Sequence, residues 1–260
     1  MCRLLGVIAN KEVDLRFSLY EGPKTLRDLS KENEDGWGLG WYRGGSPKVV
    51  KEPRQAAESR GYRRTSAEAR SRIFVAHVRK ATKGSRTMEN CHPFKWNQWL
   101  FAHNGSVDVE ALFELLNEEH RNAIHGETDS EVYFHWILQN VEQKGDVVHG
   151  IRVALREARK VRHTGLNFLL TDGEKLYAYR EASQSYNYYS LYSLSRDSRQ
   201  PGPVSFESKV GALLESKSLN NERAVLVCSE KLTQEEWLEI PLRHLLVISS
   251  NLKTNLIEMD

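Results

Sequence analysis

The residue with the clearest capacity for chemistry is Cys2, which stands directly behind the initiator methionine. Removal of Met1 leaves a thiol and a free α-amino group on the same residue. An α-amine has an ordinary pKa of about 7.7–8.0, so it can act as general base for its own side chain without a histidine. Cys2 could therefore be a self-contained nucleophile. On position alone, the alternative is a small apolar residue that opens a buried strand, because an apolar run follows at residues 4–8.

Two charged side chains stand where a small polar substrate could be held. Arg79 ends an apolar run over residues 72–79, and a guanidinium there can bind a carboxylate through two parallel hydrogen bonds. Asp129 falls in the first turn of an expected helix, where its carboxylate could meet a substrate ammonium. Each has a simpler explanation: Arg79 as a surface arginine on a strand, and Asp129 as a helix-start carboxylate that the helix dipole favours.

Asn104 and Gly105 end another strand-like run. An amide side chain and a sterically free backbone N–H at one spot would satisfy an oxyanion hole, although Asn-Gly is also a common turn dipeptide. Glycines alternate with bulkier residues at positions 36, 38 and 40, between and beside Trp37 and Trp41. This alternation predicts close approach of the backbone to another segment or to a ligand.

Hydrophobic periodicity predicts strands, then helices, then strands again. Strand-like runs in the first half cover residues 1–9, 35–43, 72–81 and 98–107. Helical spacing marks residues 109–116, 128–138 and 147–161, with a capping box expected between Thr128 and Glu131. In the second half a hairpin is expected over residues 165–181, around an Asp-Gly turn at 172–173, and further strands at 188–194, 223–228 and 244–249.

This order of elements predicts an α+β protein in which two stacked antiparallel sheets carry helices on their outer faces. Neither a linker nor an internal repeat divides the sequence, so residues 1–260 are expected to form a single domain. The chain is long enough to bury a core without disulfides or metals.

Composition argues against several classes of protein. The net charge is +2 and 28% of residues are charged, which gives no reason to expect a nucleic-acid partner. The arginine-rich segment 51–72 is expected to be a solvated helix and loop. With no apolar run of about eighteen residues and no signal-like start, the protein is expected to be neither membrane-spanning nor secreted.

The three cysteines form no Cys-x-x-Cys pair, which argues against a disulfide scaffold and favours a reducing cytoplasm. No metal is expected, because the spacing of Cys91, His77, His92 and His103 follows no zinc pattern. No cofactor is expected either, since the sequence has no phosphate loop, flavin site or ATP site.

Taken in chain order, these residues resemble the motifs of the class II glutamine amidotransferases, the N-terminal-nucleophile glutaminases. That family has a Cys directly after Met, a His-x-Arg-x-Ala-Thr-x-Gly stretch, a His-Pro step, a His-Asn-Gly motif and a Glu-Thr-Asp motif that opens a helix. The corresponding residues here are Cys2, 77–84, 92–93, 103–105 and 127–129. Residues 227–249 look like the closing segment of the stand-alone, YafJ-like branch, so the resemblance spans nearly the whole chain.

The resemblance implies the Ntn-hydrolase fold, a four-layer α/β/β/α sandwich, and catalytic roles for three residues. Cys2 would be the nucleophile, with its own α-amine as base, and the Asn104 side chain with the Gly105 N–H would form the oxyanion hole. If Met1 stayed in place, the amine would lie one residue, about 3.8 Å, too far along the chain. Removal of Met1 is therefore expected in the active form.

The resemblance also implies how a substrate is held. Arg79 would bind the α-carboxylate of glutamine and Asp129 its α-ammonium, with backbone groups near Thr82 and Gly105 completing the pocket. Two positions depart from the family pattern. Arg3 stands where many members have Gly after the catalytic Cys, and Lys80 stands where the synthases have Trp, so the pocket wall is expected to differ.

The activity that follows is hydrolysis of glutamine or of a γ-glutamyl amide. A thioester would form at Cys2 with release of ammonia or an amine, and water would then release glutamate. The chain is expected to lack the second domain that consumes ammonia in fused amidotransferases. Two alternatives stay open: a glutaminase subunit that passes ammonia to a separate synthase, and a catalytically silent glutamine-sensing module. The presence of the complete motif set argues against the silent module.

Overall fold

The structure, a computed structural model, describes residues 2–197 and 223–260. Its first sheet has seven strands, in the spatial order β11 (Leu238–Glu239), β9 (Tyr192–Asp197), β10 (Arg223–Cys228), β1 (Arg3–Val13), β4 (Ser71–Arg79), β2 (Gly36–Arg43) and β3 (Ser46–Glu52). The second has six, in the order β13 (Thr254–Glu258), β12 (His244–Ile248), β8 (Leu176–Arg180), β7 (His163–Thr171), β6 (Trp99–Val107) and β5 (Phe94–Trp96). The neighbouring strands pair antiparallel throughout these sheets.

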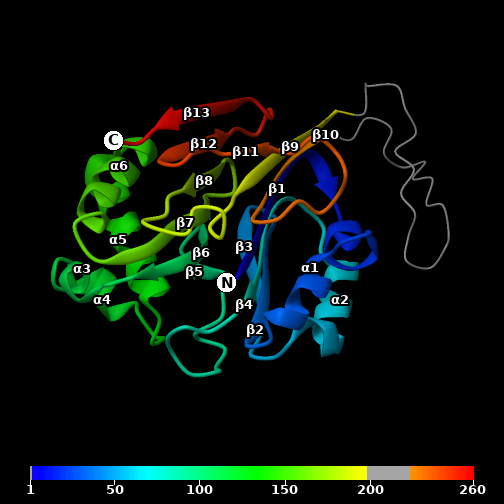
Figure 1. Cartoon of the computed structure of the whole chain (residues 1–260), viewed down its shortest axis with the longest axis horizontal. Helices are drawn as coiled ribbons and strands as arrows, with labels where there is room; N and C mark the ends of the chain where they lie inside the picture. Colours follow the sequence, from blue (N-terminus) through cyan, green and yellow to red (C-terminus); the bar gives the residue numbers. More distant parts are fainter. Residues whose placement is uncertain (1, 198–222) are drawn as a thin grey trace.

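Helices cover the outer face of each sheet, as Figure 1 shows. The α-helices are α1 (Leu26–Leu29), α2 (Arg60–Glu68), α3 (Glu110–Glu114), α4 (Glu118–Asn122), α5 (Asp129–Lys144) and α6 (Val147–Ala158). Shorter helical turns are η1 (Phe17–Glu21), η2 (Ser30–Glu32) and η3 (Ala56–Glu58). α1 and α2 pack on the seven-stranded sheet, and α5 and α6 pack on the six-stranded sheet. The predicted α+β class and the four-layer α/β/β/α sandwich are confirmed.

Side-chain alternation along β1 divides its residues between two apolar cores. Leu5 and Val7 pack toward α1 and α2, whereas Leu4 and Ile8 lie between the two sheets. Successive side chains of a strand point to opposite faces. Each fully buried leucine contributes about 1.5–3 kcal/mol, so a one-residue slip of this register would be costly.

The same alternation selects which polar residues reach the space between the sheets. Ile73 and Val75 of β4 belong to the inter-sheet core, and so do Leu100 and Ala102 of β6. The alternation continues to the ends of β4 and β6. The side chains of Arg79 and Asn104 therefore point into the same layer between the sheets.

The alternating glycines of β2 admit a neighbouring segment of backbone. A Cβ on Gly38 would lie 2.0 Å from the carbonyl oxygen of His92, and one on Gly36 would lie 2.4 Å from the Cys91 sulfur. Neither distance allows a side chain. The predicted close approach is therefore confirmed, and the approaching group is the segment around residues 91–93.

The predicted capping box at the start of α5 is wrong, although the helix begins where it was expected. Thr128 is the N-cap residue, but its side chain makes no cap hydrogen bond. The Glu131 carboxylate instead accepts a hydrogen bond of 2.6 Å from the Gly126 N–H. The Glu131 carboxylate, which a capping box would bond to the Thr128 N–H, is therefore bonded to the turn that precedes the helix.

Element boundaries differ from expectation at several places. The hairpin of β7 and β8 forms as predicted, with Gly173 at φ 93° in its turn. The strand expected at 188–194 begins at Tyr192, because residues 185–189 form a turn in which the Tyr188 N–H donates to Ser185 O at 2.8 Å. α6 ends at Ala158 rather than at residue 161. The helix expected at 109–116 is the shorter α3, and α4 follows it.

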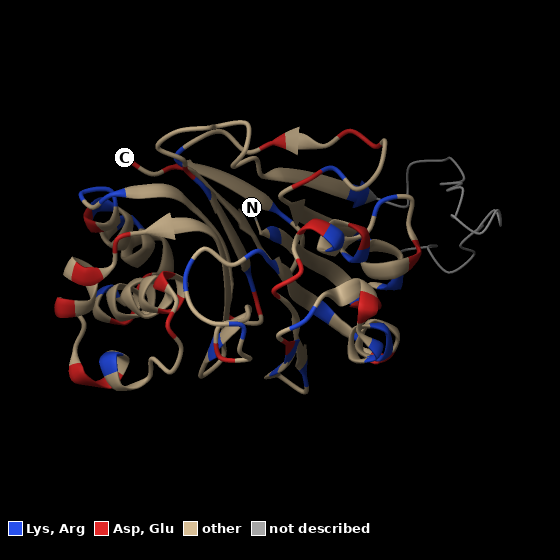
Figure 2. Cartoon of the chain, turned by 60° about the horizontal axis from the view of Figure 1, so that its bottom comes forward, with Lys and Arg blue, Asp and Glu red and all other residues tan. Residues whose placement is uncertain are grey.

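Across residues 2–197 and 223–260, none of the helices combines the length and the apolar composition that a membrane crossing requires. Figure 2 shows acidic and basic positions intermingled over the helices and loops of this part of the chain. Within segment 51–72, α2 forms with Ser59 as its N-cap, and the Ser59 hydroxyl accepts from the Tyr62 N–H at 2.9 Å.

Candidate active site

Cys2 lies at the start of β1, beside the end of β4. Its sulfur is 3.2 Å from the Lys80 N–H nitrogen, which donates to it, and 3.3 Å from the Lys80 carbonyl oxygen. The residue is half-buried. Burial raises the pKa of the Cys2 thiol, against the opposing effects of the Lys80 hydrogen bond and of the charges on Arg79 and Arg3. A thiol whose pKa is raised needs a base before it can attack a carbonyl.

Asn104 reaches Cys2 from the other sheet. The residue is 1% exposed, and its Nδ2 donates a hydrogen bond of 3.0 Å to the Cys2 carbonyl oxygen. The turn explanation of the Asn-Gly dipeptide is wrong, because both residues lie within β6 and pair with Asn167 and Leu166 of β7.

Gly105 has a conformation that excludes a side chain. Its φ is +153°, and a Cβ there would lie 1.9 Å from the carbonyl oxygen of Gly165 on β7. Glycine is thus required for β6 to pass close to β7 beside Asn104.

Arg79 is buried rather than on the surface, with 3% of its area exposed. Its guanidinium donates to three backbone carbonyls of the following loop, those of Ser85 at 3.0 Å, Lys83 at 2.7 Å and Gly84 at 3.1 Å. A guanidinium has five N–H donors, so three are engaged within the protein. Arg79 therefore organises the loop that follows β4, in addition to any contact with a substrate.

Asp129 is 4% exposed and ties the start of α5 to the end of β6. One carboxylate oxygen accepts from the Ser130 N–H at 3.1 Å, and the other accepts from the Val107 N–H at 2.8 Å. The helix-start explanation accounts for the first bond but not for the second. An ionised carboxylate has about four acceptor positions, which leaves capacity for an ammonium.

Thr82 is exposed in the loop after β4, and its hydroxyl oxygen lies 3.3 Å from that of Ser106 on β6. The loop that carries Thr82 is thereby in contact with the strand that carries Asn104 and Gly105. The structure thus brings the six predicted site residues to neighbouring ends of β1, β4, β6 and α5.

Two carboxylates that sequence reasoning gave no role also hold this loop. Asp35 accepts from the Ala81 N–H at 2.8 Å and from Arg86 Nε at 3.0 Å. Glu127 accepts from the Ser85 N–H at 2.8 Å and from its hydroxyl at 2.6 Å. These bonds to Ser85 are the main cause that lowers the pKa of Glu127. Glu127 belongs to the Glu-Thr-Asp motif, so its position carried a signal, whereas Asp35 carried none.

Three buried histidines lie in the layer beneath the site. The rings of His77 and His92 are 4.2 Å apart between centroids. Burial lowers the pKa of His77 to about 3 and that of His92 well below its ordinary value. His103 bonds to Ser130 Oγ at 2.9 Å and Gly165 O at 3.2 Å.

These imidazoles are neutral at physiological pH, and within the described residues the hydrogen bonds of the Cys2 sulfur go to the Lys80 backbone rather than to a histidine. The geometry therefore favours a base other than histidine for Cys2. Among those residues no group of His, Cys, Asp and Glu side chains is arranged to hold a metal ion.

Two facing antiparallel sheets between helical layers, with the candidate residues at the start of the first strand and at the ends of its neighbours, define an Ntn-hydrolase-like α+β protein. Residues 1–258 match the family described as class-II glutamine amidotransferases. The chain belongs to this family.

Named relatives agree with this assignment. The chain is 29% identical over 254 residues to Escherichia coli YafJ, a proposed glutamine amidotransferase, covering 92% of this chain and 94% of that protein. An uncharacterized protein of Methanocaldococcus jannaschii is 32% identical over 251 residues, which cover 91% of this chain but only 66% of that longer protein. The γ-glutamyl-hercynylcysteine sulfoxide hydrolase of Mycobacterium tuberculosis is 31% identical over 122 residues, 43% of this chain and 52% of that protein.

The fold is also that of solved structures. The glutamine aminotransferase class-II domain protein from Silicibacter pomeroyi superposes with a TM-score of 0.68 at 21% identity, covering 99% of both chains. At this identity the likeness concerns the fold.

Proposed function

We propose that the protein is a glutaminase-type amide hydrolase that acts on glutamine or a γ-glutamyl amide through a thioester at Cys2. The observation that carries this proposal is the meeting of Cys2 and Asn104, 102 residues apart in the chain, at a hydrogen-bond distance of 3.0 Å. Membership of the class II amidotransferases and the hydrolase among the relatives support it.

In the proposed reaction, removal of Met1 exposes the α-amine of Cys2, which takes the thiol proton. The sulfur attacks the side-chain carbonyl of the substrate, and the negative charge that develops on oxygen is stabilised by Asn104 Nδ2 and the Gly105 N–H. The tetrahedral intermediate collapses with loss of ammonia or an amine, which leaves with the proton from the α-ammonium. Water then attacks the thioester and releases glutamate.

The substrate head group is a zwitterion and needs one fixed cation and one fixed anion. Arg79 supplies the cation for the α-carboxylate and Asp129 the anion for the α-ammonium, with the loop at Thr82 closing the pocket. The reaction needs no cofactor or metal. A separate synthase that receives the ammonia is the alternative fate of the product.

The proposal is tested by labelling with a glutamine-mimicking diazoketone, followed by intact-mass and peptide analysis. We expect loss of Met1 and a single adduct at Cys2. Cys91 and Cys228 are internal controls, because both are fully buried and burial raises their pKa values to about 11 and about 12. An adduct at either control cysteine, or full activity of Cys2→Ala, would end the mechanism.

Cys2→Ser is the conservative variant, and Cys228→Ser is its matched control. Cys2→Ser should keep the fold and lose most of the rate, since a hydroxyl is the poorer nucleophile. Release of glutamate from a panel of γ-glutamyl amides then separates the fates of the product. Activity confined to glutamine favours an ammonia-donating subunit, and preference for a substituted amide favours a dedicated hydrolase.

A further inference from the structure

Tyr189 lies outside the sequence motifs of the family, yet its side chain reaches the strand pair of β6 and β7 beside Gly105. The residue is 9% exposed. Its hydroxyl donates a hydrogen bond of 2.8 Å to the Thr164 hydroxyl oxygen. The same oxygen accepts from the Ser106 N–H at 3.1 Å. Two hydrogen bonds therefore join the Tyr189 phenol to the residue that follows Gly105.

The ring of Tyr189 also packs on β7 at the point where β7 passes Gly105. A Cβ on Gly165 would lie 2.6 Å from Cδ1 of the Tyr189 ring, and a Cβ on Gly105 would lie 1.9 Å from the Gly165 carbonyl oxygen. Neither glycine has room for a side chain. Gly165 is therefore in close contact with both the Tyr189 ring and the backbone of Gly105, so the ring supports the strand against which Gly105 packs.

Two buried side chains hold the turn at residues 185–189 on the same sheet. The Tyr189 carbonyl oxygen accepts from Asn167 Nδ2 and from Arg180 Nε, each at 3.0 Å. Asn167 is fully buried and pairs with Asn104 across β6 and β7, and Arg180 is 5% exposed. Because both donors are buried, the backbone of Tyr189 is fixed relative to the strand that carries Asn104.

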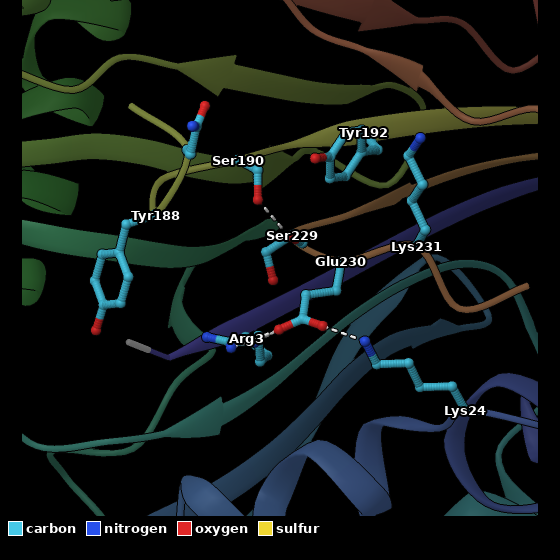
Figure 3. A pocket seen from close by; sticks show the side chains of 9 residues that line it. Arg3, Lys24, Tyr188, Ser190, Tyr192, Ser229, Glu230 and Lys231 are labelled. Carbon is cyan, nitrogen blue, oxygen red and sulfur yellow. Dashed lines mark hydrogen bonds and ion pairs between the residues drawn. The ribbon is translucent and has the colours of Figure 1, made fainter. Parts of the chain in front are cut away.

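The residue after Tyr189 connects this turn to the first sheet. The Ser190 hydroxyl donates to Ser229 O at 2.9 Å (Figure 3). The Ser229 hydroxyl accepts at 3.0 Å from the N–H of Leu4 on β1, two residues after Cys2. Burial is the main cause that raises the pKa of Tyr189, and the charge of a Cys2 thiolate adds to it. The turn thus joins both sheets beside the proposed nucleophile.

We infer that Tyr189 is a positioning residue that holds the Gly105 N–H of the proposed oxyanion hole in place. It acts through the Thr164 hydroxyl and the Ser106 N–H, and the inference rests on the proposed function. An oxyanion donor works at about 2.7–3.1 Å from the developing charge, and catalytic groups must be held within about 0.5 Å of that geometry. A glycine backbone is the least restricted of all residues, so Gly105 needs this restraint from its neighbours.

The test removes the Tyr189 hydroxyl without the ring in Tyr189→Phe, and removes its acceptor in Thr164→Val. Release of glutamate from glutamine gives kcat and KM, and calorimetry gives Tm on the same preparations. Tyr189→Phe should lower kcat by about two- to ten-fold, the effect of one hydrogen bond, with KM nearly unchanged because the oxyanion exists only in the transition state. Thr164→Val should lose at least as much, since the Ser106 N–H also loses its acceptor. In the double variant the losses should not multiply, because both changes remove the same bond.

Tyr42→Phe is the matched control. Tyr42 is 8% exposed, and its hydroxyl donates to Gln98 O at 2.6 Å. It lies near the end of β2 that is remote from Arg79. Loss of this buried hydroxyl should lower Tm and leave kcat per folded molecule unchanged. Thr164→Ser is the conservative variant, because it keeps the hydroxyl that both hydrogen bonds use, and it should keep kcat.

Three results would overturn the inference: a Tyr189→Phe variant that loses Tm but not kcat, a loss that appears only in KM, or losses that multiply in the double variant. If Tyr189→Phe does not fold, Thr164→Val and Thr164→Ser give the same comparison, and equal kcat in these two overturns the inference. In each case glutamate release by the unsubstituted protein and a diazoketone adduct at Cys2 keep the proposed function. Absence of both overturns the proposed function itself.

Discussion

Replacing Asn104 by Ala tests the oxyanion role, because the side-chain amide has a structural partner as well as a proposed catalytic one. Its Nδ2 donates to the Cys2 carbonyl oxygen at 3.0 Å in the structure. In the proposed reaction it also faces negative charge that exists only in the transition state. Loss of one such donor costs on the order of 10²–10³ in kcat, about 2.7–4 kcal/mol, with substrate binding nearly unchanged.

The structural cost should be much smaller, because the Cys2 carbonyl keeps a second donor. Arg3 Nη1 lies 3.3 Å from the same oxygen. The net loss of one hydrogen bond costs about 0.5–1.5 kcal/mol, and 1 kcal/mol shifts Tm by roughly 2–4 °C for a chain of this size. We therefore expect a Tm lower by a few degrees together with a turnover loss of roughly 100-fold or more.

The assay measures kcat and KM from glutamate release, and Tm by calorimetry, on the same preparations. Asn140→Ala is the matched control: Asn140 is 3% exposed on α5, and its Nδ2 donates to Trp136 O at 2.9 Å. This control should lose stability and keep its turnover per folded molecule. If Asn104→Ala behaves in the same way, Asn104 does not stabilise the oxyanion.

Three further predictions concern the head group, the packing of β2 and acid stability. Arg79→Lys and Asp129→Asn should each lower kcat/KM for glutamine, and less so for analogues that lack the α-carboxylate or α-amine; equal losses would contradict head-group binding. Gly38→Ala should cost at least about 1–3 kcal/mol in urea unfolding, because its Cβ would lie 2.0 Å from His92 O; an unchanged midpoint would contradict the packing. Burial holds the pKa of His77 at about 3, against about 6.5 when unfolded, so the unfolded chain binds the extra proton and stability falls as pH drops from about 6.5 toward 3. His77→Gln should flatten this dependence of Tm on pH, and an unaltered slope would show that His77 does not cause it.

Much of the fold could be predicted from the sequence because the inner strands carry local signals. β10 has the predicted bounds, and the Asp-Gly turn joins β7 and β8 as expected. The strands β3, β5, β11 and β13 were not predicted, and each lies at a sheet edge. β3 and β13 are partly exposed along their length, so they lack a clear apolar alternation. The capping box predicted between Thr128 and Glu131 is absent for another reason: the Glu131 carboxylate accepts from the Gly126 N–H instead.

Chain order and residue type predicted which residues gather at the site, but not all of what they do there. The direction of the Cys2 and Asn104 side chains follows from the alternation of side chains along their strands, which is a local property of the sequence. The engagement of Arg79 with loop carbonyls depends on how residues 83–85 turn back, and the clamp of Asp35 on Ala81 joins segments 46 residues apart. Such contacts are set by tertiary packing and leave no periodic trace in the sequence.

In the proposed function Arg79 would link substrate binding to the order of the loop after β4, and Glu127 allows these two roles to be tested separately. The guanidinium donates to carbonyls of residues 83–85, while Glu127 accepts from Ser85 at 2.8 Å on the same loop. Arg79→Lys is expected to lower kcat/KM. The part of this decrease that is also seen with a substrate lacking the α-carboxylate measures the contribution of loop order. The remaining part measures recognition of the carboxylate.

Glu127→Gln loosens the same loop while the Arg79 guanidinium stays in place. It weakens a charge-assisted bond, so we expect a smaller fall in kcat/KM than in Arg79→Lys. That fall should be of equal size on the complete and the truncated substrates, because no head-group contact is removed. If the decrease in kcat/KM of Glu127→Gln is absent with the truncated substrate, the loop acts only by positioning Arg79 for the carboxylate. Loop order and carboxylate recognition would then not be separate roles of Arg79.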